Sequence, residues 1–331
     1  MAHCVIWANA LALVFRIVLA HNETLLLRYS RLFFEKDQRM SDVLQDLIKL
    51  LRPVSIGENR FRAETQDLGF RALFGGQVMG QSLAAALLTL PEGDWAPHSL
   101  HVYFMLAGTV TDHLEFDVDV LRTGRSFATR QVKVTQNGRA ILTMICSFQH
   151  PEQGFEHQAP MPDVKGPDGI PSQLELARMF RDHFPERVRD IYTADKPIEM
   201  RVLDPVNIFA PQKKDPVKFV WMKADAPMGD DYNEHCTMLA YASDFNLVAT
   251  SLHPHAVSYG QKDLQMASLD HSIWFHRPFR MDEWLLYAID SPNAGGGRGF
   301  CRGQIFNQQG ELVVSVAQEG LIRKVDLSAK K

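Results

Sequence analysis

The sequence has no excess of basic residues and few cysteines. It contains 35 Lys and Arg against 39 Asp and Glu, for a net charge of −4, whereas a nucleic-acid-binding domain usually needs a basic face. The four cysteines form no C-x-x-C pair, so neither a zinc site nor a thioredoxin motif is visible. We therefore expect no nucleic-acid partner, and free buried thiols in a reducing cytoplasm.

Several catalytic motifs are also missing. The chain has no G-x-S-x-G elbow, no phosphate-binding P-loop and no strand-linked G-x-G-x-x-G fingerprint. The glycine-rich stretch 295–299 falls between expected strands, which favours a hairpin over a phosphate cradle. The histidines at 253, 255, 271 and 276 lack matched carboxylates, so we expect no metal site and no cofactor.

No apolar run is long enough for a convincing membrane span. The first 20 residues are apolar, but this run is short and contains Arg16. No positive charge precedes it, as a secretory signal would require. We expect residues 1–39 to lie outside the fold, either as an over-extended translation start before Met40 or as a loosely bound amphipathic helix. Stable membrane insertion is not expected.

The second half of the chain repeats the first. His98-Ser99-Leu100 is matched by His271-Ser272-Ile273, Gly124-Arg125 by Gly297-Arg298, and Gln136-Asn137-Gly138 by Gln308-Gln309-Gly310. The offsets are 271 − 98 = 173, 298 − 125 = 173 and 310 − 138 = 172. A period this long indicates two copies of one module rather than a solenoid. The chain would thus carry its own dimer, and we expect such chains to form a homo-oligomer, a dimer or tetramer.

Periodicity and turn residues predict the same order of elements in both copies. We expect a first module at 40–150, a proline-rich connector at 151–200 with one short helix near 174–180, a second module at 201–325 and a tail at 326–331. In the first module we expect helices at 42–52 and 74–90, a strand at 60–64, and a four-strand meander at 98–106, 114–122, 126–136 and 140–149. In the second we expect a strand at 217–223, a helix at 234–250, and a meander at 265–276, 283–290, 298–307 and 311–323. A long helix wrapped by a curved antiparallel sheet is the hotdog arrangement, so the fold class is α+β, a double hotdog whose copies can pair their edge strands.

The two buried helices differ in one respect. The helix at 74–90 has no acidic residue, whereas Asp244 interrupts the mostly apolar second helix. A buried carboxylate must be hydrogen-bonded or functional, so Asp244 is either a structural, capped residue or a catalytic one. Ser268 lies in an expected strand dense in polar residues, where alternation places its side chain and that of His271 on opposite faces of the strand. Gln318 ends an apolar strand and, taken alone, is typical of a satisfied edge residue.

The sequence resembles the acyl-CoA thioesterase II family, which has the double-hotdog fold. The resemblance covers about residues 42–325. It is carried by Asp67-Leu68-Gly69 with Phe74-Gly75-Gly76-Gln77, His98-Ser99 with His101, Ser147-Phe148-Gln149, Gly154-Phe155-Glu156-His157-Gln158, Tyr241-Ala242-Ser243-Asp244, Leu252 with Pro254-His255, Asp270-His271-Ser272 with Trp274-Phe275-His276-Arg277-Pro278, Glu283-Trp284-Leu285-Leu286-Tyr287 and Gln318-Glu319-Gly320.

The resemblance implies a hydrolase of fatty acyl-CoA, acting in lipid and fatty acid metabolism, with Asp244, Ser268 and Gln318 as its catalytic set. Many bacterial members carry Thr at the second position, so Ser268 keeps the hydroxyl and loses the β-branch. Asp244 would act as general base, while Ser268 and Gln318 orient the water or hold the carbonyl. Gly75 and Gly76, at the start of the first module's helix, would offer backbone N–H groups to the thioester carbonyl, which places the site between the modules. Gln77 and His271 would complete the substrate-binding set. A hotdog enoyl-CoA hydratase or dehydratase, and a non-catalytic acyl-CoA binding protein, remain alternatives.

Overall fold

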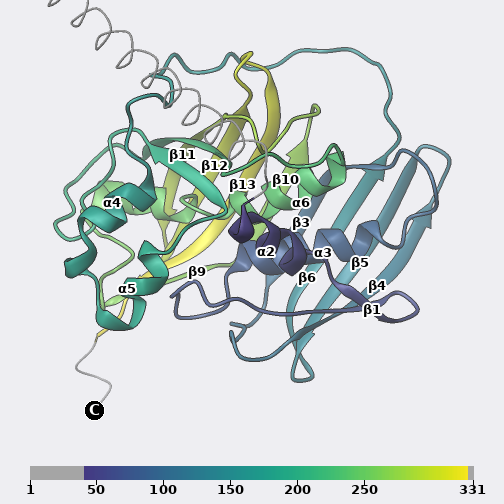
Figure 1. Ribbon diagram of the computed structural model, residues 1–331, viewed down its shortest axis with the longest axis horizontal. Helices are drawn as coiled ribbons and strands as arrows, with labels where there is room; N and C mark the ends of the chain where they lie inside the picture. Colours follow the sequence, from purple (N-terminus) through teal and green to yellow (C-terminus); the bar gives the residue numbers. More distant parts are fainter. Residues whose placement is uncertain (1–40, 327–331) are drawn as a thin grey trace, which may run out of the picture.

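A computed structural model describes residues 41–326 of the chain. The expected extension at 1–39, Cys4 and most of the expected tail lie outside these residues. Figure 1 shows two helices, α3 and α6, side by side at the centre, with strands of the first module on one side and strands of the second on the other. Within residues 41–326, thirteen strands form a single sheet.

The first module forms the elements that periodicity predicts. Ser41 caps the first helix by accepting a hydrogen bond from the backbone N–H of Leu44 at 3.2 Å, and this helix buries one face, including Leu44 and Leu51. The elements are α2 (Asp42–Leu51), β1 (Val54–Gly57), β2 (Arg60–Ala63), α3 (Gly75–Leu87), β3 (Ala96–Phe104), β4 (Leu114–Thr123), β5 (Phe127–Gln136) and β6 (Arg139–Gln149).

The second module repeats this order. Its elements are β7 (Ile198–Val202), β8 (Val217–Ala224), α6 (Tyr232–Ser243), the 3₁₀ helix η2 (Val248–His255), β9 (Leu264–Ser268), β10 (Asp270–Phe275), β11 (Leu285–Gly295), β12 (Arg298–Phe306) and β13 (Leu312–Lys324). The glycine-rich stretch forms the β11–β12 hairpin, as predicted, because Gly296 and Gly297 adopt φ angles of 57° and 75° at its turn.

The two modules join through their edge strands, as expected. The sheet order is β1-β2-β4-β5-β6-β3-β10-β13-β12-β11-β8-β7, so the second half reverses the first around the antiparallel β3–β10 pair. Leu100 lies directly opposite Ile273, and the 173-residue offset relates these same two residues. The pseudo-two-fold axis of the duplication therefore passes between them.

The prediction of a simple four-strand meander was wrong in both modules. Strands β4, β5 and β6 are consecutive neighbours, but β3 lies beyond β6 rather than beside β4. Tight turns join the three consecutive strands, whereas the longer segment 105–113 lets the chain cross from β3 to β4. This placement brings β3 to the module junction, where pairing with β10 satisfies its free edge.

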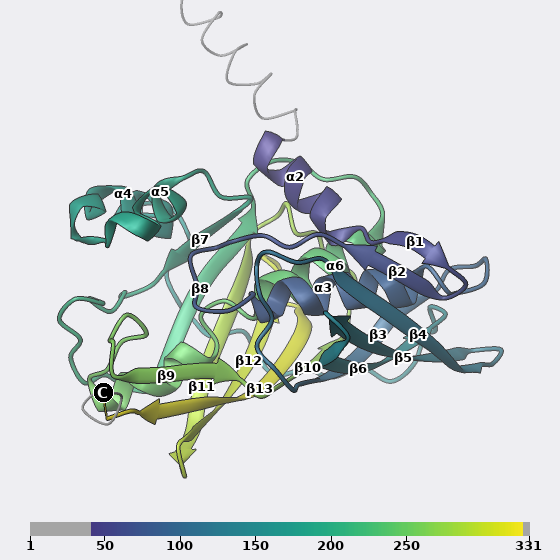
Figure 2. The same cartoon turned by 90° about the horizontal axis from the view of Figure 1, so that it is seen from below.

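The two central helices pack closely because glycines face the contact. A Cβ atom added to Gly76 would lie 2.4 Å from the carbonyl oxygen of Tyr241, and one added to Gly80 would lie 3.1 Å from that of Thr237. These pairs also show that α3 and α6 run antiparallel. The first turn of α3 therefore lies beside the last turn of α6, while α2 lies beyond both helices, on the side away from β10 and β13 (Figure 2).

The connector contains more structure than its prolines predict. The expected helix near 174–180 is present as α4 (Gln173–Met179), but a second helix, α5 (Glu186–Thr193), follows it. Ser172 and Glu175 form a capping box at the start of α4. Earlier in the connector, the carbonyl of Lys165 accepts a hydrogen bond from the indole of Trp221 at 2.8 Å, which ties this segment to β8.

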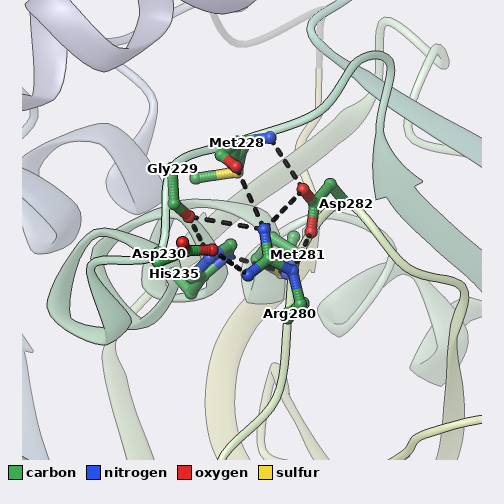
Figure 3. Close-up of polar contacts among 7 residues, drawn as sticks. All are labelled: Met228, Gly229, Asp230, His235, Arg280, Met281 and Asp282. Carbon is green, nitrogen blue, oxygen red and sulfur yellow. Dashed lines mark hydrogen bonds and ion pairs between the residues drawn. The ribbon is translucent and has the colours of Figure 1, made fainter. Parts of the chain in front are cut away.

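A charged cluster fixes the start of α6 (Figure 3). The guanidinium of Arg280 donates to both carboxylate oxygens of Asp282 and to Asp230. His235 accepts from the backbone N–H of Met281 at 3.0 Å, so its other ring nitrogen donates to the carbonyl of Gly229 at 2.9 Å. Burial lowers the pKa of His235, which favours this neutral form. The cluster holds α6 at the end opposite Asp244.

Candidate functional site at the module interface

Asp244 stands at the end of α6 rather than within it. The expected helix at 234–250 stops at Ser243, and Asp244 is its C-cap. Asn246 follows with a φ of 67°, in the left-handed region that ends helices. The chain then continues as η2. Because Asp244 is the last residue of the helical turn, its side chain reaches past the end of α6 toward α3.

Three donors converge on the Asp244 carboxylate. Oδ2 accepts from the backbone N–H of Gly76 at 2.8 Å. Oδ1 accepts from the side-chain amide of Gln318 at 2.7 Å and from the hydroxyl of Ser268 at 3.3 Å. The structure thus brings Asp244, Ser268 and Gln318 together, with the first module supplying a backbone donor.

Helix dipoles explain why a carboxylate is tolerated here. A negative charge at the C-terminus of α6 is unfavourable, but the N-terminus of the antiparallel α3 carries the opposite partial charge. The Asp244 side chain is only 5% exposed, so the Gly76 N–H and the two side-chain donors must replace the water that burial removes. In the first module the C-cap position of α3 is occupied by Leu88, which carries no charge.

A shift in strand pairing places Ser268 and His271 near the same carboxylate. Strict alternation predicted opposite faces, and this was wrong. Ser268 in β9 pairs with Gly320, but Ser272 in β10 pairs with Ala317. Four residue steps from β9 to β10 therefore match only three steps along β13. The extra residue, Leu269, separates β9 from β10, and a one-residue shift exchanges the faces of a strand.

His271 is fully buried beside Asp244. Its Nδ1 lies 3.9 Å from Asp244 Oδ1, and its Nε2 lies 3.0 Å from the hydroxyl of Ser243. That hydroxyl donates to the carbonyl of Ala240 at 3.0 Å, so Nε2 carries the ring proton and Nδ1 is an acceptor. Burial lowers the pKa of His271 to about 4, against an opposing effect of Asp244. The imidazole is therefore neutral at physiological pH.

Gln318 offers a second unfilled acceptor. Its side chain is fully buried, and its amide nitrogen binds Asp244. Within residues 41–326 its Oε1 has no hydrogen-bond partner, and neither does Nδ1 of His271. Buried polar atoms without partners are rare in native proteins. The site therefore suits a small ligand that donates hydrogen bonds.

The remaining predicted substrate-binding residues surround the first turn of α3. A Cβ atom at Gly75 would lie 2.9 Å from Asp244 Oδ2, so glycine allows the close approach. Gln77 is buried, but its amide binds the backbone of Glu64 at 3.0 Å and Gln66 at 3.2 Å. It thus holds the segment before α3, and these bonds direct its amide to that segment rather than to Asp244.

Two residues that sequence reasoning did not single out support the site. Ser243 orients His271, and the buried hydroxyl of Tyr287 donates to the carbonyl of Ser243 at 2.9 Å, which fixes the end of α6. A Cβ atom at Gly303 would lie 2.2 Å from the Tyr287 ring, so that glycine makes room for it. The sequence around these residues gave no sign of the contacts, because they join the end of α6 to separate strands.

The described part of the chain holds no group of three or more His, Cys, Asp or Glu residues arranged to bind a metal ion. None of its helices has the length and hydrophobicity of a membrane span.

The fold and the site together define a double-hotdog thioesterase. A family model described as acyl-CoA thioesterase matches residues 188–321, and one described as acyl-CoA thioesterase N-terminal domain matches residues 62–149. The two matches fall on the second and first modules. A hotdog-fold protein of unknown function from Alicyclobacillus acidocaldarius, 19% identical, has the same fold with a TM-score of 0.68 over 85% of this chain and 99% of its own length.

Closer relatives identify the family. Acyl-CoA thioesterase 2 of Haemophilus influenzae is 43% identical over 86% of this chain and 99% of its own length. Human acyl-coenzyme A thioesterase 8 is 37% identical over 86% of this chain and 90% of its own. The crystal structure of acyl-CoA thioesterase II TesB2 from Mycobacterium marinum, 36% identical, matches with a TM-score of 0.68 over 85% of this chain and 98% of that one. The chain belongs to the acyl-CoA thioesterase II family.

Proposed function

We propose that this chain hydrolyses fatty acyl-CoA to a free fatty acid and CoA, with Asp244 as the general base that activates water. Membership of the family supports the reaction. The observation that carries the mechanism is the buried Asp244 carboxylate, which three donors hold beside two unfilled acceptors.

The geometry supports a water site between Asp244 and Gln318. An ionised carboxylate accepts about four hydrogen bonds, and the contacts of Asp244 with Gly76, Ser268 and Gln318 use three of these positions. The fourth accepts one hydrogen of a bound water, and Oε1 of Gln318 accepts the other. This arrangement aims a water lone pair outward, at the thioester carbonyl carbon.

The reaction then needs two proton transfers. As the water oxygen bonds to the carbonyl carbon, Asp244 takes one water proton and negative charge develops on the carbonyl oxygen. We assign that oxygen to the backbone N–H of Gly75, since first-turn N–H groups have no partner within a helix. The Ser268 hydroxyl, which has one hydrogen, turns from Asp244 to the same oxygen as Asp244 takes up the water proton. The tetrahedral intermediate collapses, the carbon–sulfur bond breaks, and the proton on Asp244 passes to the CoA thiolate.

The two alternatives are less well supported. A hydratase or dehydratase would also use a carboxylate at this position, and a binding protein would need no general base. The relatives that cover most of the chain are described as thioesterases. Asp244, Ser268 and Gln318 moreover keep the chemistry that hydrolysis requires.

The proposal is tested by incubating the protein with palmitoyl-CoA and following CoA release with a thiol reagent. We expect release that depends on enzyme concentration, and a chain-length series then defines the acyl preference. Hydration of an enoyl-CoA without CoA release would favour the hydratase, and tight binding of acyl-CoA without turnover would favour the binding protein.

We also propose that the protein acts in the cytoplasm as a homo-oligomer. The buried, unpaired thiols of Cys146, Cys236 and Cys301 support a reducing compartment. The exposed aromatic residues Tyr103 and Trp274 on the paired strands β3 and β10 support association. Light scattering coupled to size-exclusion chromatography tests the assembly, and a monomeric mass would contradict it.

A further inference from the structure

A hollow of about 480 Å³ lies at the far end of the second module, within the size range of small-molecule sites. Apolar side chains from η2, β9 and β13 line it, and basic side chains stand among them. The apolar residues are Leu252, Leu264 and Ile322, and the basic ones are Lys213, His255, Arg298 and Lys324.

The hollow lies on the same face of the sheet as the catalytic residues. Side chains alternate along a strand, so Lys324 shares the face of Gln318 on β13, and Leu264 shares the face of Ser268 on β9. Leu264 pairs with Lys324, as Ser268 pairs with Gly320. Four residue steps along β9 therefore separate the two sites, about 13 Å at the usual rise of a strand.

Positive charge is concentrated around this hollow although the whole chain carries a net charge of −4. Lys213 and Lys324 take part in no ion pair within residues 41–326, while Arg298 binds Glu319 at 3.0 Å. Arg71, from the first module, donates to the carbonyl of Leu264 at 3.3 Å and adds a cation at the rim. Unpaired ammonium groups beside apolar side chains suit a ligand that combines phosphates with an aromatic base.

We propose that this hollow holds the phosphorylated nucleotide end of CoA while the thioester reaches Asp244. The inference rests on the proposed function. The pantetheine arm has a chain of bonds about as long as that of four extended residues, about 14 Å, which matches the separation along β9. Within the described residues β9 pairs with no strand but β13. Beyond the carbonyl of Leu264, which Arg71 binds, its outer edge can pair with the two amide groups of that arm.

Calorimetric titration with 3′,5′-ADP tests the hollow apart from any catalysis. We expect the unmodified chain to bind this nucleotide and the double variant Lys213→Ala/Lys324→Ala to bind it about ten-fold or more weakly, since the loss of even one charge-assisted hydrogen bond costs about that factor. The matched control is Lys133→Ala/Lys165→Ala, which removes two lysines elsewhere and should bind normally. Equal affinity of the two double variants, or no binding by the unmodified chain, would overturn the proposal.

Kinetics with two thioesters connect the hollow to the reaction. For octanoyl-CoA we expect the Lys213→Ala/Lys324→Ala variant to raise KM about ten-fold or more and to leave kcat nearly unchanged. For the N-acetylcysteamine thioester, which lacks the nucleotide, kcat/KM should stay as in the unmodified chain. A parallel loss on both thioesters would show a structural effect and contradict the proposal. If the unmodified chain hydrolyses neither thioester, the proposed function fails, and the nucleotide titration alone decides the role of the hollow.

Discussion

The backbone N–H of Gly76 donates to Oδ2 of Asp244 at 2.8 Å, across 168 residues of sequence. The bond connects the first turn of α3 to the end of α6 and thus joins the two modules. The first module supplies the N-terminus of α3 and the second supplies the carboxylate at the end of α6, so the pair forms only where both modules are present. The proposed catalytic set is therefore single, although the fold is duplicated.

Substitution of Gly76 should damage both packing and the site. The added methyl of Gly76→Ala would lie 2.4 Å from the carbonyl oxygen of Tyr241, so the helices must separate, at a cost of about 1–3 kcal/mol. We expect a lower melting temperature together with a lower kcat, because Asp244 moves away from its donor. Gly154→Ala is the matched control, since a Cβ atom there meets nothing within 4 Å. Equal melting temperatures for the two variants would contradict the packing account.

The hydroxyl at position 268 should matter more than the shape of the side chain. Ser268→Ala removes the donor to Asp244 Oδ1, and we expect kcat to fall about 10²-fold, as for loss of an oxyanion donor. Ser268→Thr keeps the hydroxyl and restricts its rotation, so kcat should stay near that of the unmodified chain. Steady-state kinetics with palmitoyl-CoA measure both, and similar losses in the two variants would argue against a role for the hydroxyl.

The buried His271 should make stability depend on pH. Its pKa is lowered to about 4 in the fold by burial, against about 6.5 in the unfolded chain. The unfolded state then binds more protons between these values, so stability is fully present above about pH 6.5 and is lost as the pH falls toward 4. At about pH 5 the loss amounts to roughly 2 kcal/mol.

Urea unfolding of the unmodified chain and of His271→Asn at about pH 7.5 and about pH 5 tests this linkage. Burial also lowers the pKa of His98, His235, His253 and His276, and these four remain in both proteins. The variant should therefore lose less stability on acidification than the unmodified chain. An identical loss would contradict the role of His271.

Much of the architecture followed from the sequence because its causes are local. Turn glycines and alternation located the strands, and the lone carboxylate on an apolar helix marked Asp244 as unusual. The order of β3 in the sheet did not follow, because strand pairing is set by non-local contacts. Helix α5 and strand β7, in and beside the proline-rich connector, were missed because their apolar faces are too short to give a clear periodic pattern.

The site was less predictable than the fold. Gln318 had no local signal and was assigned through the family resemblance. His271 and Ser268 seemed to face opposite ways, because alternation cannot reveal the extra residue at Leu269. That irregularity exists only because β9 and β10 both pair with β13 in different registers.

The central claim is that the Asp244 carboxylate is the general base, and kcat of Asp244→Asn with palmitoyl-CoA tests it most directly. The amide keeps the size of the side chain but cannot take a proton from water, so we expect kcat to fall about 10²- to 10⁴-fold. Asp119→Asn, on an exposed part of β4, serves as the matched control and should keep full activity. An Asp244→Asn variant that releases CoA as fast as the control would contradict the account.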